Sequence, residues 1–442
     1  MSSRHRNARP ADEAQGTLFV PDDPQTPDTP VGWSGPLAAL DASAGNGIPP
    51  AVRYLPDPPV MSDVQGERAS PETAGTADMN DPDLPYWLAI NRVKGIGPAR
   101  FKLLHDAFGS AQEVWQATPA DWQEAGLDAR TTAAFEQQRS RITPAAELER
   151  LVKLRVHVVR TLDDGYPRLL REIAAPPPLL YLRGALKPED EWAIAIVGTR
   201  RVSAYGRQVT ERLASELVGQ RITIVSGLAR GVDSCAHAAA LKAGGRTIAV
   251  LGCGPDLVYP PENARLAMRI VEEAGGAIIT EYAPGTQPDA GNFPARNRII
   301  SGLSLATLIT EAPETSGALI TARFAGEQGR DVLAVPGPIT SQGSGGANRL
   351  IQDGAKLVME VNDILAELNL HLVPQQMELR EEMPDDPVEA QLLGLLRAAS
   401  EPRHIDDLCR TTGLPTAQVS GALVMMELKG LARLVGPMTY AP

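Results

Sequence analysis

The stretch Phe293-Pro-Ala-Arg-Asn-Arg298, the apolar run over residues 305–310 and the segment Glu311-Ala-Pro-Glu-Thr-Ser-Gly317 decide the fold of this 442-residue chain. The pattern predicts a short amphipathic segment, a buried strand and the start of a second helix. It puts two arginines, an asparagine and a Ser-Gly helix start where the strand ends of a parallel sheet meet a ligand. Backbone amides at a helix N-terminus bind anions. The stretch therefore predicts an anion-binding sheet edge.

Short apolar runs alternate with helical segments around this stretch. The runs cover residues 193–198, 223–226, 247–251, 277–280, 305–310, 332–335 and 356–358. Their spacing is typical of βαβ units, and runs that are apolar on both faces indicate a sheet covered on both sides. The predicted fold class is α/β, with a doubly wound parallel, Rossmann-like sheet.

Ligands of such sheets bind beyond the carboxyl ends of the strands. The segments that follow the predicted strands are rich in glycine and arginine, which suit close backbone approach and phosphate oxygens. They are Gly198-Thr-Arg-Arg201, Ser226-Gly-Leu-Ala-Arg-Gly231, Gly252-Cys-Gly-Pro255, Glu281-Tyr282, residues 311–317 and Pro336-Gly-Pro338. Neither Gly-x-Gly-x-x-Gly nor Gly-x-x-x-x-Gly-Lys-Ser/Thr occurs, which argues against a dinucleotide enzyme and a phosphate-loop ATPase.

These residues resemble the DNA-processing protein A (DprA) family over roughly residues 86–368. The matching motifs occur in family order: Gly198-Thr-Arg200, residues 226–237, residues 293–302, residues 316–322 and Ala334-Val-Pro-Gly337. Upstream, Tyr166-Pro-Arg-Leu-Leu170 and residues 177–184 fit the lead-in to the family's Rossmann-like core. The resemblance implies a protein that binds single-stranded DNA, protects it and loads RecA recombinase during natural transformation, with no turnover chemistry and no cofactor.

The resemblance also supplies the candidate DNA-binding residues. Arg200 and residues 293–298 line the implied phosphate pocket, and the Ser226-Gly227 and Ser316-Gly317 loops lie beside it. The full set is Gly198, Thr199, Arg200, Arg201, Ser226, Gly227, Arg230, Asn292, Phe293, Arg296, Asn297, Arg298, Ser316 and Gly317. Some relatives have a lysine just before this segment, where this chain has Asp289-Ala-Gly291. Phe293, Tyr259 and Tyr282 are candidates for stacking on a base.

The family forms two-fold dimers through the end of the Rossmann-like domain, which points to residues 350–365 here. Leu350, Ile351 and Leu357 are the candidate interface residues, because a short strand at a sheet edge offers unpaired backbone groups. The alternative is that these residues cover the protein's own sheet.

The net charge of −12 and the isoelectric point near 5.1 look unusual for a nucleic-acid binder. However, the first 84 residues carry 5 Arg against 13 Asp and Glu, and therefore hold −8 of the total. Residues 1–85 also hold 14 of the 38 prolines, which predicts a disordered acidic tail. Binding follows the local phosphate-facing surface rather than the total charge.

The chain has neither the apolar core of a secretory signal nor a run of 18 apolar residues, so we expect a cytoplasmic protein. Three scattered cysteines fit a reducing compartment and exclude a thiolate zinc cage. Asp233 and His237 are spaced as helix-borne metal ligands, but a helix cap and a packed histidine explain them more simply. No metal is predicted.

Three further regions flank the Rossmann-like domain, which is predicted over residues 151–370. Residues 86–150 contain a helix, a Gly95-Ile-Gly97 turn and a second helix, which is either a phosphate-binding helix-hairpin-helix or a purely structural hairpin. Relatives carry a sterile-alpha-motif-like domain there.

Residues 371–387 are a predicted linker. Residues 388–442 have the element order of a winged helix, but its recognition helix lacks arginine, which favours a protein contact or an auxiliary DNA contact over duplex reading.

Two enzyme classes remain as alternatives. Phosphoribohydrolases of similar fold carry a catalytic glutamate after a glycine-rich turn, whereas residues 313–321 of this chain lack it. A metal-dependent endonuclease would use Glu281, Glu311 and Glu314 as ligands. Arginines beside these carboxylates favour ion pairs instead.

Overall fold

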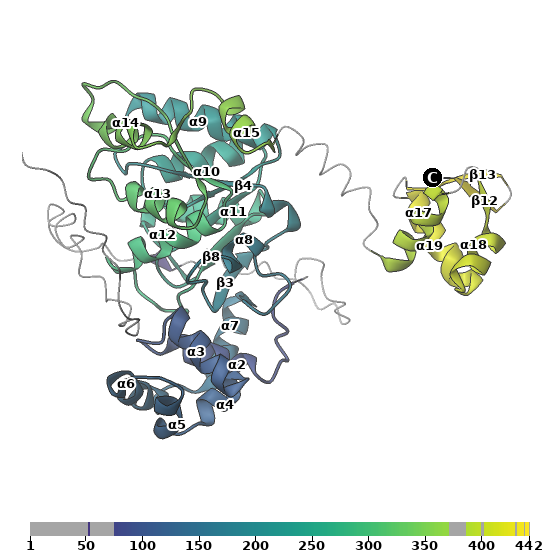
Figure 1. The fold of residues 1–442 in the computed structure, drawn as a ribbon, viewed down its shortest axis with the longest axis horizontal. Helices are drawn as coiled ribbons and strands as arrows, with labels where there is room; N and C mark the ends of the chain where they lie inside the picture. Colours follow the sequence, from purple (N-terminus) through teal and green to yellow (C-terminus); the bar gives the residue numbers. More distant parts are fainter. Residues whose placement is uncertain are drawn as a thin grey trace, which may run out of the picture. The chain divides into compact units, whose positions relative to one another are not determined.

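The structure is a computed structural model that describes residues 52–53, 75–370, 386–398, 402–428, 431–436 and 438–441 (Figure 1). Its main sheet has nine strands, and the seven from β11 to β8 run parallel. In sheet order they are β11 (Lys356–Leu357), β10 (Asp331–Ala334), β9 (Ala306–Ile309), β4 (Ala193–Val197), β5 (Thr223–Ser226), β6 (Thr247–Val250), β8 (Ala277–Thr280), β3 (Leu179–Gly184) and β2 (His157–Arg160). The seven predicted strands and the Rossmann-like fold are confirmed.

Strands β3 and β2 extend this sheet and were not predicted. Strand β3 pairs antiparallel with β8, and β2 pairs antiparallel with β3. The run Leu179 to Leu182 is buried on both faces, as the parallel strands are, but it precedes the alternation of strands and helices that identified them.

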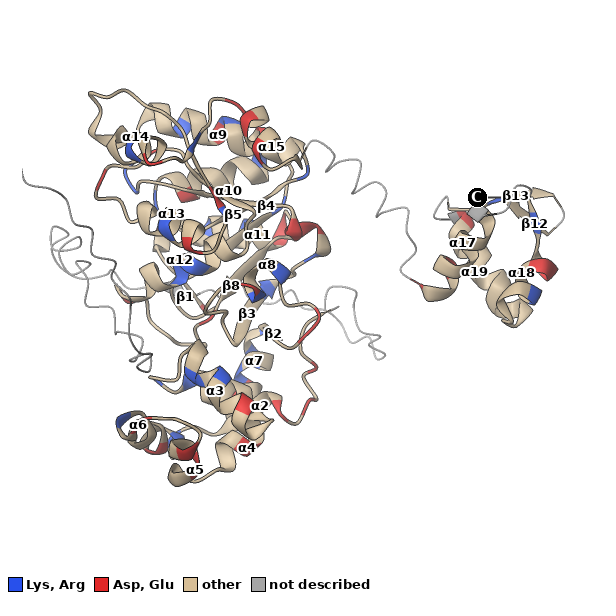
Figure 2. Cartoon of the chain, viewed as in Figure 1, with Lys and Arg blue, Asp and Glu red and all other residues tan. Residues whose placement is uncertain are grey.

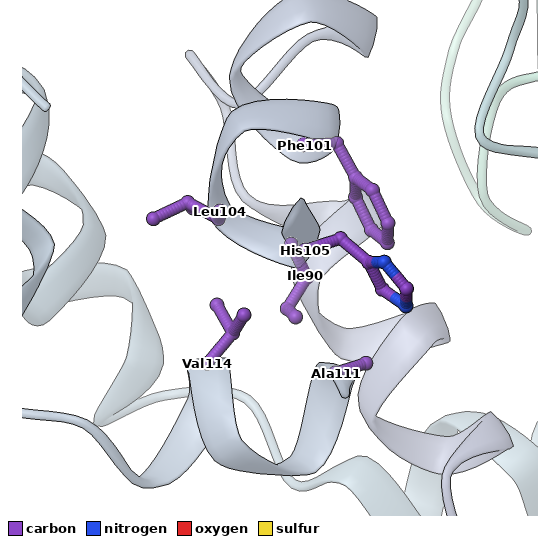
Figure 3. A pocket seen from close by; sticks show the side chains of 6 residues that line it. All are labelled: Ile90, Phe101, Leu104, His105, Ala111 and Val114. Atoms are coloured by element: carbon purple, nitrogen blue, oxygen red, sulfur yellow. The ribbon is translucent and has the colours of Figure 1, made fainter. Parts of the chain in front are cut away.

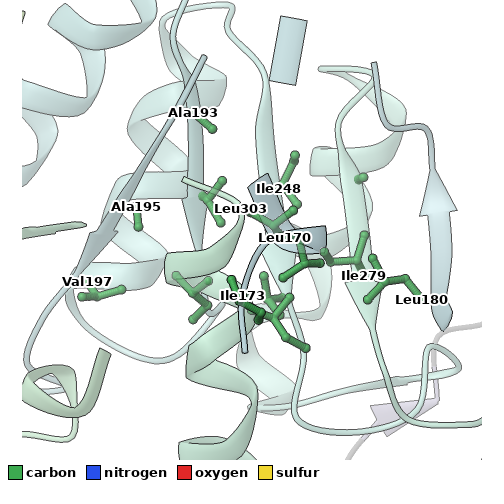
Figure 4. Packing of buried hydrophobic residues seen from close by; sticks show 14 of the residues in the cluster. Leu170, Ile173, Leu180, Ala193, Ala195, Val197, Ile248, Ile279 and Leu303 are labelled. Carbon is green, nitrogen blue, oxygen red and sulfur yellow. The ribbon is translucent and has the colours of Figure 1, made fainter. Parts of the chain in front are cut away.

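Helices cover both faces of the sheet because each strand sends alternate side chains to opposite sides. Ile194 and Ile196 of β4 pack with α9 (Ala204–Gly219), α10 (Val232–Lys242) and α15 (Val361–Glu367). Ala193, Ala195 and Val197 pack on the other face, within the cluster of Figure 4. The helices that contribute to this second cluster are α8 (Arg168–Arg171), α12 (Asn292–Gly302), α13 (Ala318–Glu327) and α14 (Gly345–Gln352). Helix α11 (Ala264–Glu272) packs on the β6 and β8 side chains Ala249 and Ile278.

A helical region precedes the sheet, and its apolar core also includes Val158 of β2 and Leu179 and Tyr181 of β3. Its helices are α2 (Leu84–Arg92), α3 (Pro98–Phe108), α4 (Ala111–Gln116), α5 (Pro119–Glu124), α6 (Ala129–Arg139) and α7 (Pro144–Leu154). The side chains in Figure 3, among them Ile90, Phe101 and Val114, leave no space for a water molecule between them. The predicted helix-turn-helix is present, and Gly95 takes a φ of +99° in its turn. The predicted boundary at residue 150 falls inside α7, whose Leu151 belongs to this helical core.

The predicted disordered tail, residues 1–85, lies mostly outside the described residues. Within it, β1 (Val52–Arg53) pairs antiparallel with β7 (Leu257–Val258). Residues 75–85 are also structured: the Ala77 amide donates to the Val158 carbonyl oxygen at 2.8 Å, and α2 begins at Leu84. The ordered chain therefore begins before the predicted boundary, because Ala77 is buried against the helical core.

The C-terminal region has the predicted winged-helix order. It consists of α17 (Pro387–Ala398), β12 (Arg403–His404), α18 (Ile405–Thr412), α19 (Thr416–Leu428), β13 (Arg433–Gly436) and β14 (Thr439–Ala441). The small strand β12 pairs with β14 and was not predicted. The predicted linker, residues 371–387, lies outside the described residues up to residue 385.

None of the described helices is long and apolar enough to cross a lipid bilayer.

His237 is fully buried on α10, and its hydrogen bonds define its protonation. The Thr247 hydroxyl donates to the Ile224 carbonyl oxygen at 2.7 Å, so it accepts from His237 Nδ1, 2.7 Å away. Within the described structure, His237 Nε2 has no hydrogen-bond partner. Burial, with a smaller contribution from the Arg296 charge, lowers the pKa of His237 from 6.5 to about 3. The folded protein therefore holds this histidine neutral.

We expect the free energy of unfolding to fall as the pH falls from 6.5 towards 3. Over this range the unfolded chain binds a proton at residue 237 that the folded chain does not, which costs about 1.4 kcal/mol per pH unit. Urea unfolding at several pH values measures this slope. His237→Gln should make the slope shallower by about that amount, and an identical slope in the variant would contradict the assignment.

Candidate nucleic-acid interface

The loops at the carboxyl ends of the parallel strands gather most of the candidate residues. From the sheet order, the loops after β10, β9, β4, β5 and β6 follow one another along one edge. Residues 198–203 follow β4, residues 227–231 follow β5, and Phe293 lies in the first turn of α12 beside Gly252, which follows β6. The edge described below is this row of loops together with the start of α12.

Glu311 fills the position at the start of α9 where dinucleotide folds bind phosphate. The Ser203 amide donates to Glu311 Oε2 at 2.8 Å, and the Thr199 amide donates to the Glu311 carbonyl oxygen at 2.7 Å. The Glu311 side chain is buried, and a Cβ at Gly206 would lie 2.0 Å from its carboxylate. Because a carboxylate of the protein already occupies this helix start, a second anion there would be repelled. This explains the missing Gly-x-Gly-x-x-Gly pattern.

Arg200 and Phe293 form the accessible part of the edge. The Arg200 guanidinium lies 5.9 Å from the centre of the Phe293 ring, and the Phe293 and Tyr259 rings lie 5.2 Å apart at 41°. Phe293 is half-buried, while Arg200 and Arg201 are exposed. In the described part of the chain, neither arginine forms an ion pair with a carboxylate. Two open cations beside an aromatic pair suit a ligand with phosphates and flat rings.

Arg296 lies beneath this surface rather than on it. Its side chain is 4% exposed, and Nη1 donates to the Gly227 carbonyl oxygen at 2.7 Å and also to that of Val250. A Cβ at Gly227 would lie 2.3 Å from the guanidinium, so this glycine makes room for it. Burial lowers the pKa of Arg296, and the buried Asp233 carboxylate opposes that shift. Arg296 therefore ties the loop after β5 to the end of β6, and its predicted direct place in the pocket is corrected to a supporting one.

Arg298 is also occupied by a partner within the protein. It forms a two-pronged ion pair with Glu281, with distances of 2.8 and 2.7 Å, and both side chains are largely buried. Arg230 pairs with Glu262 at the surface. Of the five candidate arginines, the structure therefore leaves Arg200 and Arg201 open and gives the other three internal partners.

The remaining candidates form the framework of the edge. The Ser226 hydroxyl donates to the Ile196 carbonyl oxygen at 2.7 Å, and the Asn292 amide side chain donates to the Gly252 carbonyl oxygen at 3.2 Å. Asn297 Oδ1 accepts from Arg296 Nε at 3.1 Å. A Cβ at Gly198 would meet Val232 and the Glu311 carbonyl oxygen, so this glycine is required by packing.

Two loop residues have hydroxyl groups that accept hydrogen bonds from backbone amides two residues further along the chain. Thr199 Oγ1 accepts from the Arg201 amide at 3.1 Å, and Ser316 Oγ accepts from the Ala318 amide at 3.3 Å. Gly317 is exposed, with open space where a Cβ would be.

The described residues contain no group of three or more His, Cys, Asp and Glu side chains able to hold a metal ion. Glu281 is paired with Arg298, Glu311 accepts amide hydrogen bonds, and Glu314 is exposed. Asp233 Oδ2 accepts from the Gly227 amide at 3.2 Å, while His237 bonds Thr247. Of the three residues that the endonuclease alternative requires, Glu281 and Glu311 are therefore engaged with different partners, and Glu314 has no carboxylate cluster beside it in the described structure.

Charged side chains of both signs are interspersed over the described part of the chain (Figure 2). Many surface arginines pair with a carboxylate four residues along the same helix, as Arg212 does with Glu216 and Arg269 with Glu273. Such pairs leave little net field. The open cations of the edge therefore matter more than the total charge.

Two protein-family models match this chain. The family model described as DNA recombination-mediator protein A matches residues 157–369, and that of the DprA winged helix domain matches residues 377–436. Protein Smf of Synechocystis is 37% identical over 82% of this chain and 99% of its own length. The DNA processing protein DprA of Streptococcus pneumoniae is 47% identical over 47% of this chain and 72% of its own.

The solved structure of DNA processing protein A from Streptococcus pneumoniae is 37% identical to this chain. The match has a TM-score of 0.57 and covers 64% of this chain and 97% of that one. Sequence, domain order and fold agree. The chain belongs to the DprA (Smf) family of DNA-processing proteins.

Proposed function

We propose that this protein binds single-stranded DNA at the edge, protects the incoming strand and loads RecA recombinase onto it in natural transformation and recombination. The observation that carries the binding part is the pairing of open Arg200 and Arg201 with the Phe293 and Tyr259 rings. Bases of a single strand are free to stack on such rings, whereas those of a duplex are not. Arginines at the same edge contact the phosphates between them.

We further propose that the protein has no turnover activity. Residues 313–321 lack the catalytic glutamate of the phosphoribohydrolases, and at the start of α9 Glu311 takes the place of a dinucleotide phosphate. We also propose that the protein acts in the cytoplasm, because an incoming DNA strand meets the recombinase there.

Binding assays with three ligands test this function. The full-length protein is titrated with a single-stranded oligonucleotide, the same sequence as duplex and a mononucleotide, each at two salt concentrations. We expect tightest binding to the single strand and a steep loss with salt, because phosphate contacts release counterions. Tighter binding of the mononucleotide, or its hydrolysis by pure protein, would favour the enzyme alternative. Assembly of RecA on protein-bound single strands tests the loading step separately.

We propose that the functional unit is a homodimer through the β11 edge. In this region Leu357 is 37% exposed and Met359 is 69% exposed, while Leu350 packs against the protein's own core and Ile351 is half-buried. Beside β11 lies a groove of about 420 Å³ lined partly by Leu350 and Lys356. Exposed apolar side chains on an edge strand favour pairing with a second copy. Of the three candidate interface residues, Leu357 is thus the most available.

We expect Met359→Asp to give a folded monomer that binds long oligonucleotides at least tenfold more weakly than the unmodified protein. A dimer holds two edges on one strand, which raises the effective concentration of the second edge. Short oligonucleotides should bind nearly normally. Analytical ultracentrifugation measures the oligomeric state, and Val152→Asp, at an exposed valine of α7, is the matched control. An unmodified protein that is monomeric at micromolar concentration would contradict the interface.

The winged-helix domain is proposed to contact a protein rather than to read duplex DNA. Residues 416–428, which form α19, contain no Lys or Arg, and Val424 and Met425 are exposed on this helix. Leu434 and Val435 of β13 are exposed as well. Duplex binding depends on cations that face phosphate, which this helix does not offer.

A further inference from the structure

Tyr205 and Ile339 are two apolar side chains that the sequence did not single out, and both are exposed at the carboxyl edge of the sheet. Tyr205 lies in the first turn of α9 and is 43% exposed, and Ile339 lies in the loop after β10 and is 95% exposed. The Tyr205 hydroxyl donates to the Pro336 carbonyl oxygen at 2.7 Å, which links the helix to that loop. These two residues are called the second patch below.

The loop that carries Ile339 is held in place on both sides. The Gly337 amide donates to Asn348 Oδ1 at 3.0 Å, and Asn348 Nδ2 donates back to the Gly337 carbonyl oxygen at 2.9 Å. A Cβ at Gly337 would lie 2.1 Å from the Ser344 hydroxyl. The loop is thus anchored, and Ile339 projects from it without packing on the core. An isoleucine in this position is available to a ligand.

The second patch continues the edge on the side away from Phe293. Strands β9, β4 and β5 separate β10 from β6, so the two ends of this row lie about 19 Å apart at about 4.8 Å per strand. Arg200 and Arg201 follow β4, between these ends. Only a ligand longer than a single nucleotide reaches from Phe293 to the second patch.

We propose that the bound single strand crosses the whole edge, with bases on the Phe293 and Tyr259 rings at one end and on Tyr205 and Ile339 at the other. Arg200 and Arg201 contact the backbone between the two sets of bases. This inference rests on the proposed function and adds the path of the strand. The loop after β9 lies under that path and carries the exposed side chain of Glu314. This side chain turns towards Gly345: its Cγ lies 3.3 Å from the position that a Cβ on Gly345 would take.

Fluorescence of Ile339→Trp tests the path directly. The variant adds one tryptophan to the five of the chain at a site where its ring meets no core packing. We expect an oligonucleotide of about 12 residues to quench the added fluorescence, because a stacked base contacts the ring, and one of about three residues to quench it little. Val152→Trp, at a position 61% exposed on α7, is the matched control and should not respond. Equal responses of the two variants would overturn the path.

Affinity measurements provide an independent readout. Ile339→Ala and Tyr205→Ser should each weaken binding of the longer oligonucleotide about three- to tenfold and leave the shorter one unchanged, since each removes a base contact. Tyr205→Phe keeps the ring and should bind nearly as the unmodified protein does. If the unmodified protein does not bind single strands, the proposed function fails. If it binds, Arg200→Ala weakens binding and the second-patch variants bind the longer oligonucleotide normally, the path alone is wrong.

Discussion

Arg298→Ala is expected to lower the free energy of unfolding by about 3 to 5 kcal/mol, the cost of removing one partner of a buried ion pair. The Arg298 and Glu281 side chains are 13% and 14% exposed, and two hydrogen bonds of 2.8 and 2.7 Å join them. Removal of the guanidinium leaves the Glu281 carboxylate without its partner in a poorly solvated place. Urea unfolding of the purified variant measures the loss.

A matched control separates this effect from the loss of any arginine. Arg212 pairs with Glu216 on the surface of α9, where the two side chains are 57% and 33% exposed. Arg212→Ala should leave the stability nearly unchanged, because exposed pairs contribute little. The double variant Glu281→Gln with Arg298→Gln should recover part of the lost stability. An Arg298→Ala protein as stable as the unmodified one would contradict the buried ion pair.

This stability effect changes how a binding defect at Arg298 is interpreted. In the family resemblance, Arg298 lines the phosphate pocket, and weaker DNA binding by Arg298→Ala would look like a lost phosphate contact. The structure offers another cause, because the ion pair ties α12 to the end of β8. Binding by this variant is therefore informative only under conditions where the protein is shown to be folded.

The strands could be predicted because the chemistry that makes them is local. A run such as Thr223 to Ser226, buried throughout between glycine-rich or polar turns, matches the structure residue for residue. Strands β2 and β3 were missed because they join the sheet antiparallel, outside the βαβ repeat, and no local pattern specifies such a pairing. The short β12 has only two residues and depends on its partner β14.

The roles of the arginines could not be predicted, because the sequence gives the residue type but not how far the side chain is buried. Arg200 and Arg296 both lie in matching motifs, yet one is exposed and the other is 4% exposed. Arg296 can be buried because Gly227 lacks the side chain that would collide with its guanidinium. Glu311 was considered as a metal ligand, whereas its carboxylate accepts from the Ser203 amide. These contacts join residues 69 and 108 positions apart, beyond the range of any local signal.

The double variant Arg200→Ala with Phe293→Ala is expected to lose about 3 to 5 kcal/mol of binding free energy for single-stranded DNA. One stacked base accounts for about 1 to 3 kcal/mol, and a charge-assisted phosphate contact for about 1.5 to 3 kcal/mol. The two contributions come from neighbours, since the Arg200 guanidinium lies 5.9 Å from the Phe293 ring, so the single variants need not add. Fluorescence anisotropy with a labelled oligonucleotide measures each of them.

Salt dependence separates the two contributions. Arg200→Ala should make the slope of log affinity against log salt shallower by about one unit, because one phosphate contact is lost. Phe293→Leu, which keeps an apolar side chain against Tyr259, should weaken binding and leave that slope unchanged. Arg269→Ala removes the same charge from the Glu273 pair on α11 and is the control for net charge. If Arg200→Ala and Arg269→Ala have equal affinity and equal slopes while both are folded, then Arg200 does not contact the phosphates, and the open arginines of the edge lose their proposed role.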